Sequence, residues 1–370
     1  MLTGGGEETY RALLRSGGQF VRRIEVHRAG VRIDTYGDAG LPIASGSLSA
    51  TLDNRVSRRL QLTASGALFP WKAGDLLDPL ASELVVYAGW RGGAQPAYWW
   101  PVFTGPIVSI SMQDGSPSLS LGATDWGETI AEDKFLSPVR SGAGTLVTAR
   151  IRDLITDSLP GVEFGTIDET YAVVAELTWE ADRSQALDDM AAGAGCFWYQ
   201  LPDGRFTIRR IPWAQRSLST PVATINGRDN ATSITISTGR SGIYTAVQVS
   251  GEAPTGNAPV SGSAQDEDPN SRTYIRGPLG RRVLKVQEDT VSQDAQAQSL
   301  ARQRLRRSTA QIYTIASSSP FDPAIELGDT ATLVTTGGSF DRALVSFNAQ
   351  LVGAPIMSAT WRAVGEGEDG

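Results

Sequence analysis

The chain has 370 residues, of which 41% are hydrophobic and 20% are charged, a composition typical of a folded protein rather than a disordered one. Its net charge of −7 argues against a protein that binds nucleic acid tightly by releasing counterions. The same charge is compatible with a surface past which DNA slides without sticking. One cysteine and one histidine exclude an internal disulfide and cysteine-based metal sites, and they disfavour a Ser-His-Asp triad.

The termini and hydropathy predict a soluble protein made in the cytoplasm. No apolar run reaches membrane-spanning length, and the first residues lack the charged-then-apolar form of a signal peptide. Residues 1–18 are rich in glycine at both ends and are predicted to form an N-terminal arm.

A first β domain is predicted over residues 19–124, where short runs alternate apolar and polar residues between turn signals. This spacing is typical of a small barrel or sandwich. In one run Leu60, Leu62 and Ala64 alternate on a single face. Near its end, Trp99–Thr104 and Ile107–Met112 are predicted to be two strands joined by a turn at Gly105-Pro106.

Residues 125–212 change to a helical period and predict a small α+β module made of two helices and a hairpin. Thr145 and Asp182 are placed to cap the two helices, and Gln185 follows Asp182 at the capping-box spacing. A Pro-Asp-Gly turn at 202–204 then closes the hairpin.

A second β domain is predicted over residues 213–364, followed by a flexible tail at 365–370. Residues 251–272 are expected to be a long polar surface loop, because glycine, proline and acidic residues dominate it. Inside the domain, Leu279–Thr335 is predicted as strand, helix and strands. The helix buries one narrow stripe, formed by Ala297, Leu300, Ala301 and Leu305.

Three stretches carry a resemblance to a known family. Gly46–Thr63 has the pattern G.L..TLD…RR.L.LT, the hairpin closes on DG.F, and Pro320–Val334 has the pattern P…P.I.LGD…V. Together with the domain order, these stretches resemble the hub proteins of phage tails. These are the baseplate hubs of contractile tails and the related minor tail proteins of long non-contractile tails. The resemblance covers most of residues 20–362.

The resemblance implies a mainly β fold, in which two tail-tube-like β domains are structural repeats flanking the α+β insertion. It implies a structural hub and no enzyme: a homotrimer whose two tube-like domains per chain make a ring of six. Such a ring matches a hexameric tail tube on one side and a three-fold tip on the other.

The partners that the resemblance implies are the tail tube or a distal tail protein, the tape measure protein, and a central spike or fibre. The hub would seat the end of the tape measure, nucleate tube assembly and leave a channel for DNA at the tail tip of the virion. The resemblance implies no cofactor, no sequence-specific binding of nucleic acid and no membrane-spanning segment. No lysozyme-like or peptidase extension is expected from the sequence, so a cell-wall-cutting hub is disfavoured.

Tryptophans of the first β domain support an alternative from another class. Trp99 and Trp100 are consecutive in a predicted strand and must face opposite sides of the sheet. With Trp71 and Trp90, they could form a subunit interface or hold a sugar, as in a receptor- or carbohydrate-binding tail protein. Simple core packing is a third interpretation.

Other candidate sites favour structural interpretations. The run Asp266-Glu267-Asp268 could offer oxygen ligands to a divalent cation, but a solvated loop is the better interpretation because no EF-hand spacing accompanies it. Gly142-Ala143-Gly144 lacks the Lys-Ser/Thr ending of a phosphate-binding loop. His27 is expected to pack or to form hydrogen bonds, and Cys196 to be a small core residue. A hydrolase would need a carboxylate pair, and none stands out among Glu163, Asp168, Glu169, Glu176 and Glu180.

Overall fold

The computed structural model describes residues 13, 18–52, 56–93, 96–141, 144–168, 178–210, 219–251, 260–288, 291, 294–309 and 312–363. The predicted arm at 1–18 lies almost wholly outside these residues, as do the predicted tail at 365–370 and most of the segment that links the α+β module to the second β domain.

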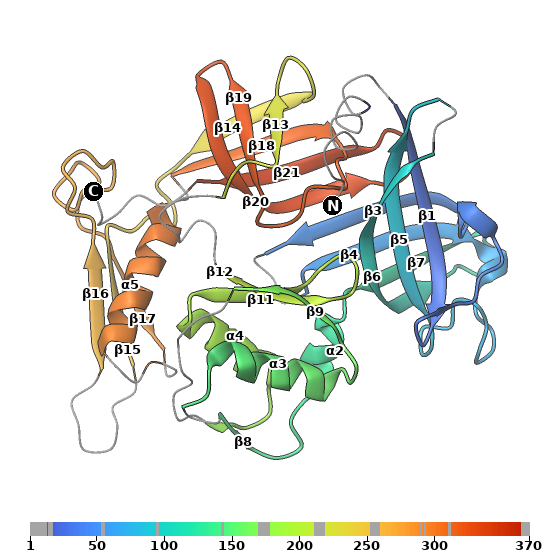
Figure 1. Cartoon of the computed structure of the whole chain (residues 1–370), viewed down its shortest axis with the longest axis horizontal. Coiled ribbons are helices and arrows are strands. Elements are labelled where there is room, and N and C mark those ends of the chain that lie inside the picture. Colours follow the sequence, from blue (N-terminus) through green and yellow to red (C-terminus); the bar gives the residue numbers. More distant parts are fainter. Residues whose placement is uncertain are drawn as a thin grey trace.

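The fold is mainly β, as predicted, and is built around one sheet of 13 strands (Figure 1). The strands before residue 125 form what we call the first β unit. They are β1 (Gln19–Arg28), β2 (Val31–Arg32), β3 (Ile43–Thr51), β4 (Arg58–Ser65), β5 (Glu83–Arg91), β6 (Tyr98–Ser111) and β7 (Ser118–Thr124), with short 3-10 turns η1 (Gly37–Ala39) and η2 (Gly66–Leu68).

One predicted turn of the first β unit is wrong, because Gly105-Pro106 lies inside a continuous strand. β6 pairs with β5 through its first half and with β7 through its second half. At the change of partner the strand passes close to the backbone of Thr124. Glycine allows this approach because it has no Cβ, so the residues that signalled a turn mark a bend within a strand.

We expect Gly105→Ala to destabilise the protein by about 1–3 kcal/mol, because the added methyl group overpacks the bend. A Cβ at this position would lie 2.0 Å from the carbonyl oxygen of Thr124. Thermal unfolding measures the loss. Gly239→Ala is the matched control, since a Cβ there meets no atom within 4 Å. Equal unfolding temperatures for the two variants would contradict this account of the bend.

The second β unit contains the strands of the large sheet that follow residue 219, and its strand order repeats that of the first. Its strands are β13 (Ala223–Asn226), β14 (Ser233–Thr238), β18 (Tyr313–Pro320), β19 (Thr330–Thr335), β20 (Gly338–Gln350) and β21 (Ile356–Arg362). The order β14-β18-β21-β20-β19 corresponds strand for strand to β3-β4-β7-β6-β5.

The two units join edge to edge into a single sheet. β20 pairs antiparallel with β3, with Asn348 opposite Ser49. Buried side chains of both units form one continuous hydrophobic core, in which Leu48 and Leu60 of the first unit share a cluster with Leu344 and Trp361 of the second. The sequence predicted two β domains without this shared sheet.

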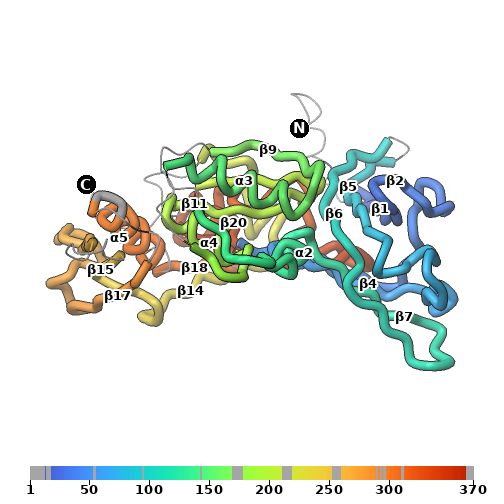
Figure 2. Tube along the Cα trace, turned by 90° about the horizontal axis from the view of Figure 1, so that it is seen from below, coloured from blue at the N-terminus to red at the C-terminus, as the bar shows by residue number. Residues whose placement is uncertain are grey.

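A separate lobe, which we call the α5 lobe, is inserted between β14 and β18. It consists of β15 (Ala246–Ser250), β16 (Ser261–Gln265), β17 (Val283–Gln287) and helix α5 (Asp294–Thr309). These strands form their own sheet, in the order β16-β15-β17, at the far end of the molecule (Figures 1 and 2). The predicted helical stripe is confirmed, since Ala297, Leu300, Ala301 and Leu305 are buried against this sheet.

The lobe corrects two predictions. β15 and β17 were expected to belong to the second β domain, and residues 251–272 were expected to be one surface loop. The described part of that segment instead contains β16. Asp266 after it is fully buried and accepts hydrogen bonds from the hydroxyl groups of Ser271 and Thr273.

The α+β module packs below both units and has a hydrophobic core of its own (Figure 1). It contains α2 (Gly127–Glu132), β8 (Val139–Arg140), α3 (Val147–Ser158), β9 (Phe164–Ile167), β10 (Thr178–Trp179), α4 (Arg183–Gly193), β11 (Cys196–Gln200) and β12 (Phe206–Arg210). Both predicted helices and the hairpin are present. The prediction that Thr145 caps the first of these helices is wrong, because the N-cap of α3 is Leu146. The side chain of Leu146 makes no capping hydrogen bond.

Asp182 caps α4 as predicted, by accepting a hydrogen bond of 3.0 Å from the backbone N–H of Gln185. Desolvation acts to raise the pKa of this carboxyl. The N–H of Gln185, the hydroxyl of Ser184 and the ammonium of Lys134 outweigh it and lower the pKa to about 2. The folded state therefore favours the charged cap.

We expect Asp182→Ala to destabilise the protein by about 1 kcal/mol, since the cap is lost. The stability that comes from the carboxylate is present above its ordinary pKa of 3.8 and is lost as the pH falls through about 2. Asp182→Asn keeps a capping oxygen but does not titrate. The difference in unfolding free energy between wild type and this variant should therefore shrink over that interval, and urea titrations at several pH values measure it. A constant difference would contradict the assignment.

Candidate functional site

Arg58 is the centre of a junction that joins both β units to the α+β module. It begins β4 in phase with Leu60, Leu62 and Ala64, all of which face the core. The side chain is therefore carried into the interior, where it is 2% exposed. This residue was not among those predicted from the sequence, although an arginine two positions before an alternating apolar run was the available signal.

The guanidinium of Arg58 bridges two segments that are far apart in the sequence. Nη1 donates to the carbonyl oxygen of Gln200 in β11, and Nη2 donates to Oε1 of Glu326. The same guanidinium lies 5.9 Å from the ring centre of Tyr199. Burial raises the pKa of the Glu326 carboxyl, and the charge of Arg58 opposes that rise. A buried cation thus faces a carboxylate across the two units.

Asp125 fixes the start of the α+β module to β4. Its Oδ2 accepts hydrogen bonds from the backbone N–H of Arg58 at 2.7 Å and from the hydroxyl of Ser57 at 2.5 Å. Its Oδ1 accepts from the N–H of Gly127 at 3.0 Å. Burial raises the pKa of this carboxyl, although each of these donors acts to lower it.

Gln200 and Tyr199 complete the junction from the module's hairpin. The amide of Gln200 donates to the carbonyl oxygen of Thr104 at 2.8 Å and accepts from the N–H of Trp126 at 2.7 Å. The hydroxyl of Tyr199 donates to the carbonyl oxygen of Leu327 at 3.3 Å. These bonds hold the hairpin against the first and the second unit at once.

The junction brings together the three stretches that carry the family resemblance. Arg58 lies in the Gly46–Thr63 pattern, Gln200 ends the first strand of the DG.F hairpin, and Glu326 precedes the LGD of the third pattern. The sequence indicated each stretch separately. The structure shows that they meet around one buried arginine.

A second feature is the open face of the large sheet, which we call the hydroxyl face. Eight strands present it, in the order β14-β18-β21-β20-β3-β4-β7-β6. The register places these Ser, Thr, Asn and Gln residues on it: Ser233, Thr235, Ser237, Thr314, Ser318, Ser358, Thr360, Ser346, Asn348, Gln350, Ser45, Ser47, Ser49, Thr51, Gln61, Thr63, Ser65, Ser118, Ser120, Ser109 and Ser111.

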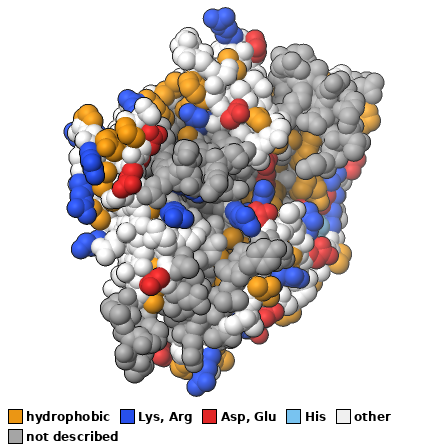
Figure 3. All heavy atoms as spheres, turned by 60° about the vertical axis from the view of Figure 1, so that its left-hand side comes forward, with side chains coloured by type: hydrophobic (Ala, Val, Ile, Leu, Met, Phe, Trp, Pro, Cys, Tyr) orange, Lys and Arg blue, Asp and Glu red, His pale blue; other side chains and the backbone are white. Residues whose placement is uncertain are grey.

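Charge is nearly missing from this face. Arg59 and Arg362 are its charged residues, and none of these strand positions carries a carboxylate. A solvated protein surface ordinarily has about 25–35% charged residues of both signs. On the face seen in Figure 3, acidic and basic side chains are indeed interspersed. The hydroxyl face therefore differs from an ordinary solvated sheet.

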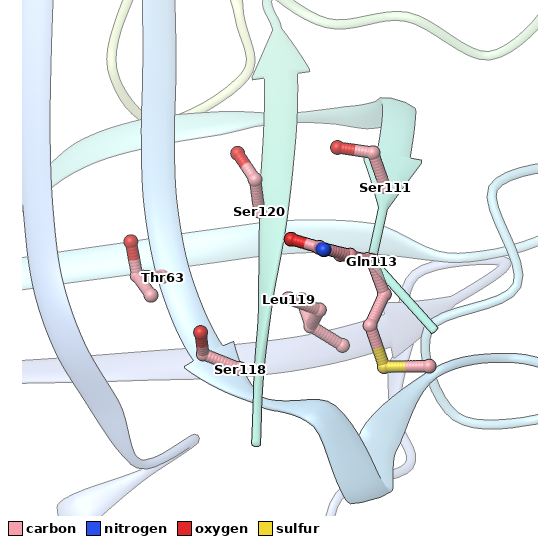
Figure 4. A pocket seen from close by; sticks show the side chains of 7 residues that line it. Thr63, Ser111, Gln113, Ser118, Leu119 and Ser120 are labelled. Carbon is pink, nitrogen blue, oxygen red and sulfur yellow. The ribbon is translucent and has the colours of Figure 1, made fainter. Parts of the chain in front are cut away.

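A hollow of about 460 Å³ lies at one end of the hydroxyl face. Thr63, Ser118, Ser120 and Ser111 line it, and their hydroxyl groups stand along three neighbouring strands (Figure 4). Gln113 and Met112 close it at the turn after β6. Neutral donors and acceptors without an ionic anchor suit weak polar contacts, and do not suit a tightly held ligand.

The tryptophans proposed for an interface or a sugar do not form one patch. Trp90 is 5% exposed and donates to the carbonyl oxygen of Phe321 at 2.9 Å. Trp99 and Trp100 point to opposite sides of the sheet, and Trp99 lies under the guanidinium of Arg23. Trp71 is 72% exposed on a separate loop, where it contacts Phe69.

The remaining candidates have structural partners. His27 lies 2.9 Å from a carboxylate oxygen of Glu25, and Cys196 is buried in the core of the module, as expected. Asp266 is buried and not solvated. Among the described residues no group of three His, Cys, Asp or Glu is placed to hold a metal ion. Gly142, Ala143, Glu169 and Glu176 lie outside those residues.

Comparison with solved structures gives the context for this arrangement. The chain is similar to a tail protein from Neisseria meningitidis MC58, with a TM-score of 0.66 and 14% identity over 92% of this chain and 96% of that one. It is also similar to the 43 kDa tail protein of prophage MuSo2 from Shewanella oneidensis, with a TM-score of 0.59 and 11% identity over 92% and 98%.

The chain has the fold of phage tail proteins. A third structure with this tail-protein fold is prophage tail protein gp18 from Listeria monocytogenes EGD-e, with a TM-score of 0.58 and 12% identity over 94% and 95%. No protein-family model and no curated protein matches the sequence. At these identities the likeness establishes the fold alone, and it confirms the predicted resemblance at that level. In the described part of the chain, no helix is long and apolar enough to cross a membrane.

Proposed function

We propose that this protein is the structural hub of a phage tail tip or baseplate, a non-catalytic adaptor between a hexameric tail tube and a three-fold tip. The observation that carries the proposal is the edge-to-edge fusion of two β units with the same strand order. Because each chain holds two such units side by side, three chains supply six, which is the number a hexameric tube requires.

The hydroxyl face is the surface that would line the channel of this ring. Each chain contributes eight strands to it. At about 4.8 Å between neighbouring strands, three chains would enclose a ring at least roughly 37 Å across, measured between backbones. A ring of this size accommodates a DNA duplex together with its water.

The chemistry of the hydroxyl face suits the passage of DNA. Hydroxyl and amide groups can hydrogen-bond to phosphate oxygens and to water. Tight, salt-sensitive binding would require many cations, since each neutralised phosphate releases counterions. With Arg59 and Arg362 as its charged residues, the face neither holds DNA strongly nor repels it.

The Arg58 junction gives the adaptor its rigidity, because it ties both β units to the α+β module through buried hydrogen bonds. A fixed angle between the units would let the assembled ring act as a template for tube polymerisation. The partners in this proposal are the tail tube or a distal tail protein, the end of the tape measure protein, and a central spike or fibre. The place of action is the tail tip of the virion.

Electron microscopy of particles made without this gene product tests the proposal. If the protein is the hub, tubes fail to form and heads or loose subunits accumulate. Complete tails that do not attach to cells would instead favour a receptor-binding protein. Expression of the protein from a plasmid should restore tubes, which controls for effects on neighbouring genes.

A further inference from the structure

Two strand edges lie open at opposite ends of the hydroxyl face. β14 pairs with β18 on one side, and no described strand pairs with its other side. At the far end, the second half of β6, Ile107–Ser111, pairs with β7 on one side. On its other side the N–H of Ile107 donates to the carbonyl oxygen of Ser82, and no described strand covers the residues that follow. Both edges expose side chains, including Ser237 on β14 and Val108 on β6.

The β14 edge has no protection against pairing. Its sequence, SITIST, contains no charge and no proline, and five of its six residues are exposed. Folded proteins usually blunt such an edge with lysine, proline or a bulge, because unpaired backbone groups recruit other strands. An unprotected edge of this kind indicates that another strand covers it in the assembled state.

The internal repeat identifies that strand. In the correspondence of the two units, β14 is equivalent to β3, and β6 is equivalent to β20. Within one chain, β20 and β3 are paired. The two open edges are therefore the equivalents of two strands that already pair with each other, and the geometry of that contact can repeat between chains.

A register shift in both units fixes the alignment. The β6–β7 pairing shifts between Ile107 and Ser109, and the β20–β21 pairing shifts between Leu344 and Ser346. Superposing the shifts makes Ser109 equivalent to Ser346 and Ser111 equivalent to Asn348. From there the pairing can be followed strand by strand, through β7, β4 and β3 in the first unit and through β21, β18 and β14 in the second. This makes Ser237 of β14 equivalent to Ser49 of β3.

We infer that β14 of one chain pairs antiparallel with the end of β6 in a second copy, beginning at Ser109, with Ser237 opposite Ser111. The intrachain pair that sets this register is Asn348 opposite Ser49. The contact joins different surfaces of the two copies, so it is head-to-tail and closes into a ring when the rotation allows. The inference rests on the proposed ring of three chains and adds to it the strands and the register of the interface.

The hairpin of β6 and β7 is placed to make this contact. It extends away from the body of the molecule in Figure 2 and carries Ser111 next to its tip. Pairing would continue the hydroxyl face across the interface, because Ser237 and Ser111 both lie on that face. The channel surface would then be unbroken from chain to chain.

Disulfide crosslinking tests the register. The double variant Ser111→Cys/Ser237→Cys should convert most of the protein into a covalent ring on a non-reducing denaturing gel after mild oxidation. Opposed strand residues have Cα atoms about 4.5–5.5 Å apart, within the range of a disulfide. Neither single variant should crosslink. Cys196 can stay, because it is buried and its pKa is raised to about 11.

The intrachain pair is the matched control. Asn348→Cys/Ser49→Cys should form a disulfide within one chain, which shows that this pairing geometry accepts the bond. Crosslinking of Ser237→Cys alone would indicate a two-fold contact of β14 with itself and would overturn the inference. A trimer without crosslinks overturns the register but leaves the proposed ring. A protein that stays monomeric at every concentration, with no crosslinks between chains, overturns both.

Discussion

Arg58→Met is expected to lower the free energy of unfolding by about 3–5 kcal/mol, the cost typical of removing one partner of a buried ion pair. Methionine fills much of the space of the arginine side chain, so the loss comes from the carboxylate of Glu326 and the carbonyl of Gln200, which are left without their donor. Urea denaturation followed by tryptophan fluorescence measures the effect. The α+β module should also unfold less cooperatively with the β units.

Arg59 provides an unusually close control for this prediction. It is the next residue in the same strand, but it faces outward and is exposed. Arg59→Met should therefore change the stability by no more than about 0.5 kcal/mol. The double variant Arg58→Met/Glu326→Gln removes both charges and should recover part of the loss. If the two single arginine variants are equally stable, the junction does not hold the units together.

The sequence predicted the parts of the fold that local chemistry determines. Asp182 and Gln185 marked the start of α4, the Pro-Asp-Gly turn marked the hairpin, and the spacing of Leu300, Ala301 and Leu305 marked the buried side of α5. In each case the signal lies within a few residues of the structure that it specifies.

What the sequence could not predict depends on contacts between distant segments. The glycine at position 105 signalled a turn, since close approach to Thr124 is invisible without the neighbouring strand. β15 and β17 have the same alternation as strands of the large sheet, so their membership of a separate lobe did not show. The pairing of β20 with β3, which fuses the two units, spans some three hundred residues of chain.

The candidate site divides in the same way, into features that a local sequence pattern indicates and features that depend on contacts between distant segments. Alternation of serine with apolar residues is visible in β3 and in β7 taken singly, but only the register places Ser49 and Ser120 on one surface with the hydroxyl groups of six other strands. For Arg58, the phase of the strand was a readable signal of burial, although no prediction was made from it. Its partners Gln200 and Glu326 were not, because they come from two other parts of the chain.

Placing lysines on the hydroxyl face should turn a surface that DNA passes into one that holds it. The triple variant Gln61→Lys/Ser120→Lys/Asn348→Lys puts three cations on exposed positions of β4, β7 and β20. Each lysine that reaches a phosphate should steepen the dependence of log K on log salt by about 0.9, or roughly 2.7 for the three lysines of one chain. Salt titrations of duplex DNA binding to the purified protein measure the slope, and fluorescence of released DNA measures ejection from assembled particles. Ejection should become slower.

A triple variant of equal charge separates the channel from general attraction. Val31→Lys/Leu80→Lys/Leu136→Lys places its cations on exposed residues outside the eight strands of the hydroxyl face. Nonspecific attraction between a less acidic protein and DNA would affect both variants alike. An effect confined to the face variant requires DNA to run along those strands, because the Debye length at physiological salt is only about 8 Å. If both variants bind DNA with the same salt slope and particles with the face variant eject at the normal rate, the hydroxyl face does not line the DNA channel.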